Sequence, residues 1–160
     1  MTIRAMPTAI ASIILLAAWL GAALLVAAVV APAAFAVLPS RALAGALVGR
    51  VLPTLFWSGI ILGLGVAALA WTAPRRGWVV GGALVLAVAS AVAQLVVSPR
   101  IERVRAQIGG PVDALDPSDP RRQAFGRLHG MSVAWMGVGG LAASIALLVL
   151  ARNLASRSSP

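Results

Sequence analysis

Four polar side chains near the ends of two apolar stretches are the residues best placed to do chemistry. His129, in FGRLHGMS at 125–132, is the only histidine in the chain. Ser132 follows three residues later, which places it on the same face of a helix. Gln94 and Ser98 are four apart and share a face of the preceding apolar stretch. Imidazole exchanges protons near neutral pH, and amides and hydroxyls orient ligands through hydrogen bonds.

The connection between these stretches joins their polar ends, so both pairs should lie at one membrane surface. Further cationic and aromatic residues belong to that surface, and together they predict a polar mouth. It comprises His129, Gln94, Ser98, Ser132, Arg100, Arg127, Arg50 and Trp57. One interpretation is a small binding site centred on His129. The alternative, which the sequence favours, is structural: His129 caps helix carbonyls or bonds Gln94, because polar groups within a membrane face the interior of a helix bundle.

The pattern of acidic and sulfur-containing residues argues against catalysis and metal binding. The four acids lie at 102, 113, 116 and 119, outside the longest apolar runs, so no paired carboxylates serve a span. Calcium loops place acids at alternate positions, so Asp113, Asp116 and Asp119 are predicted turn and cap residues. The chain has no cysteine. Met136 is two helical turns from His129, which leaves a copper or haem site without a second nearby ligand. We therefore expect no enzyme, no metal and no cofactor.

The composition places the protein in a membrane. Apolar residues make up 61% of the chain and charged residues 11%. Residues 5–40, 51–74, 77–99 and 128–151 carry no acidic or basic residue other than His129. A bilayer core needs roughly 20 apolar residues in a helix. The sequence predicts an all-α integral membrane four-helix bundle, with helices at about 8–38, 41–71, 77–98 and 120–153. We expect one domain over 1–153 and a polar tail over 154–160, with the first helix retained rather than cleaved.

The net charge of +9 comes from arginines in the connections between the spans. Cations in such places face lipid headgroups, so we expect the lipid bilayer as a partner and no nucleic acid. Arginines at the two ends of the bundle are unequal in number. One end has Arg41, Arg50, Arg100, Arg103, Arg105, Arg121, Arg122 and Arg127, and the other has Arg4, Arg75, Arg76, Arg152 and Arg157. This tally predicts a multi-pass membrane protein with both termini outside the cytoplasm.

Small residues recur at the spacing of helix contacts, as in Gly45 and Gly49 or Gly59 and Gly63. In lipid such pairs let helix backbones approach closely. They predict packing within the bundle, and they also fit self-association or contact with other membrane subunits.

Three stretches carry a family resemblance: WLGAALLVAAVVAPAAFAVLP at 19–39, GRVLPTLFWSGI at 49–60, and SPRIERVRAQ at 98–107 followed by FGRLHGMS. Their order and spacing resemble an uncharacterised bacterial membrane family akin to transmembrane protein 205, a domain of unknown function. The resemblance runs from about Trp19 to Leu150 and implies a four-helix membrane bundle without enzymatic activity. The animal relative's association with platinum-drug resistance implies metal or vesicle handling. The opening helix also distantly resembles the copper-resistance D membrane proteins.

Three functions remain open from the sequence. The first is a non-enzymatic accessory or structural subunit of a membrane assembly, acting through helix–helix interactions. The second is a protein that handles a small molecule or a metal ion, copper or haem, at the polar mouth around His129. The third is a small transporter assembled as an oligomer, which needs a continuous polar path through the bundle.

Overall fold

The first apolar stretch forms a continuous helical rod in the computed structural model, which describes residues 5–71 and 76–158. The rod comprises α1 (Ala5–Leu25), the π-helical turn η1 (Val26–Val30) and α2 (Ala31–Val37). Proline lacks an N–H and clashes with the preceding turn. The wide turn ends two residues before Pro32, and the Ala31 N–H bonds the Val26 carbonyl five residues back. A π-turn thus accommodates the proline within the helix.

The second helix is α3 (Arg41–Ala70), and its start follows the sequence prediction. Ser40 is the N-cap, and its Oγ accepts a hydrogen bond from the Leu43 N–H at 3.2 Å. Pro53 lies inside α3 and does not end it. Residues 72–75, which belong to the connection between the second and third predicted helices, and Arg4 lie outside the described residues.

The third helix is longer than the predicted 77–98. It comprises α4 (Arg76–Ala91), the π-helical η2 (Val92–Val97) and α5 (Ser98–Ile108). Again the wide turn ends two residues before a proline, here Pro99, and Ser-Pro does not end the helix. The end comes at Gly109, whose φ of 66° is left-handed and whose N–H bonds the Arg105 carbonyl at 3.1 Å. Glycine adopts this conformation without strain, which makes it a common helix stop.

A loop with the short 3₁₀ turn η3 (Val112–Ala114) leads to α6 (Pro120–Ser158). The acids of this loop have the predicted turn and cap roles. Asp116 accepts from the N–H and the hydroxyl of Ser118, and Asp119 accepts from the Arg121 N–H at 2.8 Å. The helix passes the predicted end at 153 because neither glycine nor proline interrupts residues 141–159.

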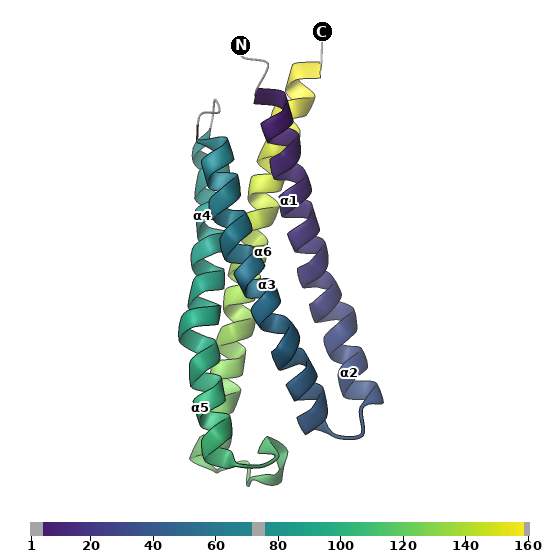
Figure 1. Ribbon diagram of the computed structural model, residues 1–160, viewed down its shortest axis with the longest axis vertical. Helices are drawn as coiled ribbons and strands as arrows, with labels where there is room; N and C mark the ends of the chain where they lie inside the picture. The colour runs from purple at the N-terminus through teal and green to yellow at the C-terminus, as the bar shows by residue number, and fades with distance from the viewer. Residues whose placement is uncertain (1–4, 72–75, 159–160) are drawn as a thin grey trace.

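The helices run up and down, so the described ends of α1 and α6 lie together (Figure 1). The 38–40 connection and the 109–119 loop lie at the opposite end, which we call the loop end. The most extensive contacts join α3 to α4 and α4 to α6, whereas α1 contacts α3 and α6.

Small residues set the close spacing of the central helices. A Cβ at Gly63 would lie 2.6 Å from the Ala83 carbonyl oxygen, and one at Gly59 would collide with the Ser90 hydroxyl. These glycines therefore pack α3 directly on α4, as their spacing predicts. Trp19 of α1 is 2% exposed, and its Nε1 donates to the Leu55 carbonyl at 3.0 Å. This hydrogen bond joins α1 to α3 in the centre of the bundle.

Four helices are long and apolar enough to cross a membrane: Met6–Val37, Arg41–Ala70, Gly77–Ile108 and Pro120–Ser156. Large apolar side chains on them point outward, such as Leu24 (66% exposed) and Leu141 (65% exposed). A soluble protein rarely presents such extended apolar surfaces, whereas lipid tails cover them without cost. The predicted fold class is confirmed: the protein is an all-helical, four-helix, multi-pass membrane bundle.

Candidate functional site

A cavity of about 570 Å³ opens between α3, α5 and α6 near the loop end. We call it the loop-end cavity. Its polar lining residues are Arg41, Gln94, Ser98, Glu102, Arg105, His129 and Ser132. Its apolar and backbone lining comes from Phe35, Gly45, Val48, Gly49, Leu52, Pro53, Pro99, Ile101 and Phe125. The cavity therefore combines charged groups with an apolar wall.

Arg105 crosses from α5 to α3 along one edge of this cavity. One guanidinium nitrogen donates to the Gly45 carbonyl at 3.2 Å, and the other terminal nitrogen lies 3.5 Å from Glu102. A Cβ at Gly45 or Gly49 would approach these nitrogens to 3.2 and 3.3 Å. The predicted small-residue pair at this position thus makes room for an arginine rather than for another helix.

An aromatic stack connects this arginine to the histidine. The Arg105 guanidinium carbon lies 5.5 Å from the centre of the Phe125 ring, within reach of a cation–π interaction. Phe125 and His129 are one helical turn apart, and their rings are parallel within 5° at a centroid distance of 6.3 Å. His129, which is exposed, therefore lies beside the aromatic wall at the rim of the cavity.

The π-turn η2 shapes the inner part of the cavity. Ser98 donates its hydroxyl to the Ala93 carbonyl at 2.9 Å, across the wide turn. Gln94 also belongs to η2, and its Oε1 is buried without a hydrogen-bond partner. Gln94 Oε1 therefore accepts no hydrogen bond from His129. A buried acceptor left unpaired is costly and fits a site that gains a partner on binding.

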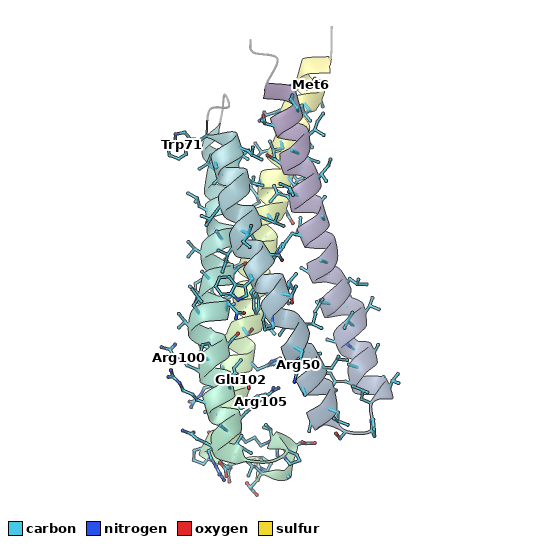
Figure 2. All side chains as sticks on the ribbon, in the orientation of Figure 1. Met6, Arg50, Trp71, Arg100, Glu102 and Arg105 are labelled. Atoms are coloured by element: carbon cyan, nitrogen blue, oxygen red, sulfur yellow. The ribbon has the colours of Figure 1, made fainter. Side chains whose placement is uncertain are left out.

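The structure gathers half of the predicted polar mouth and leaves the other half outside. His129, Gln94, Ser98 and Ser132 line the cavity. Arg50, Trp57, Arg100 and Arg127 are exposed and are not among its lining residues. Arg100 follows Ser98 by two residues, which turns it to another face of the helix. In Figure 2, Arg100 projects away from the bundle, whereas Glu102 and Arg105 project toward α3.

The cavity is also lined by residues that were not predicted to belong to the polar mouth: Arg41, Arg105, Phe35 and Phe125. The spacing of polar residues in the sequence could have indicated Arg105. The Gln94 and Ser98 face continues at helical spacing to Glu102 and Arg105 once α5 is recognised as an extension of the membrane helix. Among the described residues, no group of three or more His, Cys, Asp or Glu is placed to hold a metal ion.

Below the cavity the bundle core is closed. The deepest lining residues are Pro53, Gln94 and Ser132, and the next turns carry Leu55 and Ser90, which are 5% and 3% exposed. Trp19 bonds Leu55 at this level. Toward the loop, a second cavity of about 480 Å³ shares Arg41, Gly45 and Arg105 with the first. The polar space thus extends toward the loop end.

A second feature lies on the outer surface of α4 and α6. This groove of about 670 Å³ has no charged lining residue, and we call it the outer groove. It is lined by Gly77, Trp78, Gly81, Gly82, Val85, Val138, Leu141, Ala142 and Ile145. A Cβ at Gly77 or Gly81 would have nothing within 4 Å, so these glycines are not needed for packing inside the bundle.

Comparison with known families identifies the chain's family. A model for a domain of unknown function (DUF4149) matches residues 14–109, more than half of the 160 residues, so the chain belongs to this family. The matched region includes Trp19, Gly59, Gln94 and Arg105, and it ends before α6. No curated protein and no solved structure matches the chain.

Proposed function

We propose that this member of the DUF4149 family is a non-enzymatic membrane protein that acts through helix–helix contacts, as an accessory or structural subunit of a larger assembly. We also propose that the protein resides in a bacterial inner membrane. The observation that carries it is the outer groove on α4 and α6, in which Gly77 and Gly81 lie open to the bilayer, whereas Gly82 packs against Ala142 of α6. Helices associate in lipid mainly by close van der Waals packing against small residues.

The groove fits a partner helix in its chemistry and its shape. Gly81 and Gly82 form its floor, and Val85, Leu141 and Ile145 form apolar walls that are 40–65% exposed. A partner with large apolar side chains would fill it without burying a polar group. Because lipid tails solvate these walls equally well, the gain comes from packing against the glycines.

Native mass spectrometry of the protein extracted from its own membrane tests this function. We expect a complex with a different subunit that Gly81→Leu disrupts, since the new side chain fills the groove. Gly65→Leu is the matched control, because Gly65 is exposed on α3 with nothing within 4 Å of a Cβ. A lone monomer, a complex of two copies only, or equal stability of both variants would contradict the accessory role.

A second candidate function is the binding of a small molecule in the loop-end cavity. The observation that favours it is the unpartnered Oε1 of Gln94 beside a space of about 570 Å³. We favour an organic ligand over copper or haem because the lining offers one imidazole with Arg41 and Arg105, and cations repel a metal ion.

A further inference from the structure

The distribution of charge and apolar surface in the loop-end cavity points to a ligand class. Arg41 and Arg105 both line it, and Glu102 is the acidic lining residue. Arg41 is one helical turn before Gly45, whose carbonyl holds the Arg105 guanidinium. Both cations therefore line the part of the cavity nearest the loop end.

Arg105 retains capacity to bind an anion. A guanidinium has five N–H donors in a planar fork, and the Gly45 carbonyl takes one of them. The contact with Glu102 is 3.5 Å long, and the Glu102 side chain is 67% exposed, so solvent weakens that pair. A phosphate at this position would receive charge-assisted hydrogen bonds.

The remainder of the lining suits a hydrocarbon chain. Val48, Leu52 and Ile101 extend the wall toward the bilayer interior, while Gln94 offers a polar group at the inner end. Arg41 begins the candidate span of α3, which places the cationic end at headgroup level. From the loop end inward, the lining is therefore cationic, then apolar along Val48, Leu52 and Ile101, and polar again at Gln94 and Ser132.

We propose that the loop-end cavity binds an anionic phospholipid, with its phosphate at Arg41 and Arg105 and an acyl chain along Val48, Leu52 and Ile101. The inference rests on the second candidate function, to which it adds the ligand class, and is independent of the outer groove. It differs from general attraction of arginines to headgroups because Arg100 and Arg127, also near the loop end, lie outside the cavity.

Native mass spectrometry of the purified full chain, titrated with phosphatidylglycerol or with phosphatidylcholine of identical acyl chains, tests this proposal. We expect about tenfold tighter binding of phosphatidylglycerol, and a loss of about tenfold in Arg41→Gln and in Arg105→Gln, since one charged hydrogen bond is worth that much. The matched controls Arg100→Gln and Arg127→Gln should keep wild-type affinity.

If Arg105→Gln fails to fold, Arg41→Gln decides the outcome. Within the described residues, Arg41 makes no hydrogen bond that its replacement would break. Equal losses in all four variants, or displacement of the lipid by excess inorganic phosphate, would overturn the lipid assignment. If phosphatidylcholine binds equally well and Gln94→Leu abolishes both, charge recognition fails and the second candidate function survives. If phosphatidylglycerol does not bind, the lipid proposal is overturned, and retention of another co-purifying small molecule would then preserve the second candidate function.

Discussion

At the residue scale, Asp119 shows how one loop side chain fixes the start of a membrane helix. Its carboxylate accepts hydrogen bonds from the Arg121 N–H and pairs with the Arg121 guanidinium at 2.8 Å. These contacts lower the pKa of Asp119 from 3.8 to about 2, and the side-chain hydrogen bond from Arg121 is the largest cause. The ionised cap therefore anchors α6 at the loop end.

This pKa predicts a defined pH window for the order of the helix start. Because the pKa is lower in the folded state, the stabilisation is complete above about pH 4 and is lost as the pH falls toward 2. In NMR spectra of the protein in micelles, the Arg121 amide should titrate with a midpoint near 2. Asp119→Asn should remove that titration. A midpoint near 3.8 in the wild type would show that the cap is not formed.

The sequence predicted several polar residues that line the cavity, but it did not predict the contacts that other residues make around them. His129, Gln94, Ser98 and Ser132 stand out because polar groups are rare in apolar spans. Arg105 did not stand out because it is one of several arginines near the loop end, and its special role depends on where α3 passes it. Trp19 was equally hidden, since its indole bonds a backbone carbonyl that no side-chain pattern marks.

At the element scale, contacts between α3 and α4 depend on glycines that admit no side chain. Gly63→Ala would place a Cβ 2.6 Å from the Ala83 carbonyl oxygen. Because both atoms are attached directly to helix backbones, the clash can be relieved only by moving α3 away from α4. We expect a destabilisation of about 1–3 kcal/mol from this overpacking, measured by thermal unfolding in detergent.

The control for this prediction lies on the same helix. Gly65 is exposed, with nothing within 4 Å of a Cβ, so Gly65→Ala should leave the unfolding temperature unchanged or raise it slightly. Equal destabilisation of both variants would mean that helix propensity, rather than contact with α4, determines the cost at Gly63.

The number, order and starts of the helices could be predicted because apolar length and caps are local properties. The third helix extends past the predicted span of 77–98 through SPRIERVRAQI, the amphipathic stretch expected as its possible continuation, because the π-turn η2 lets the helix pass Pro99 and reach Ile108. That continuation is what brings Arg105 to Gly45. The cavity itself could not be predicted, since it depends on the relative placement of α3, α5 and α6.

At the scale of the whole molecule, the bundle divides into two halves. Toward the end of the bundle where α3 ends and α4 begins, the core is closed by apolar residues such as Val66 and Ala83, both 0% exposed. Toward the loop end it opens into the cavity that holds Gln94 and Arg105. Trp19, Leu55 and Ser90 separate the halves, an arrangement that suits binding from one side better than passage through the bundle.

Cysteine accessibility tests this central claim most directly, because the chain has no native cysteine. Ser98 and Ser90 are two turns apart on one helix face. Ser98 lines the cavity, whereas Ser90 is buried in the closed core beyond the inner end of the cavity. Ser98→Cys should react with a small water-soluble thiol reagent and be protected by phosphatidylglycerol, whereas Ser90→Cys should stay unreactive with or without lipid. Equal reactivity at both positions, or an unreactive Ser98→Cys in the lipid-free protein, would contradict a cavity that is open at the loop end and closed at Trp19.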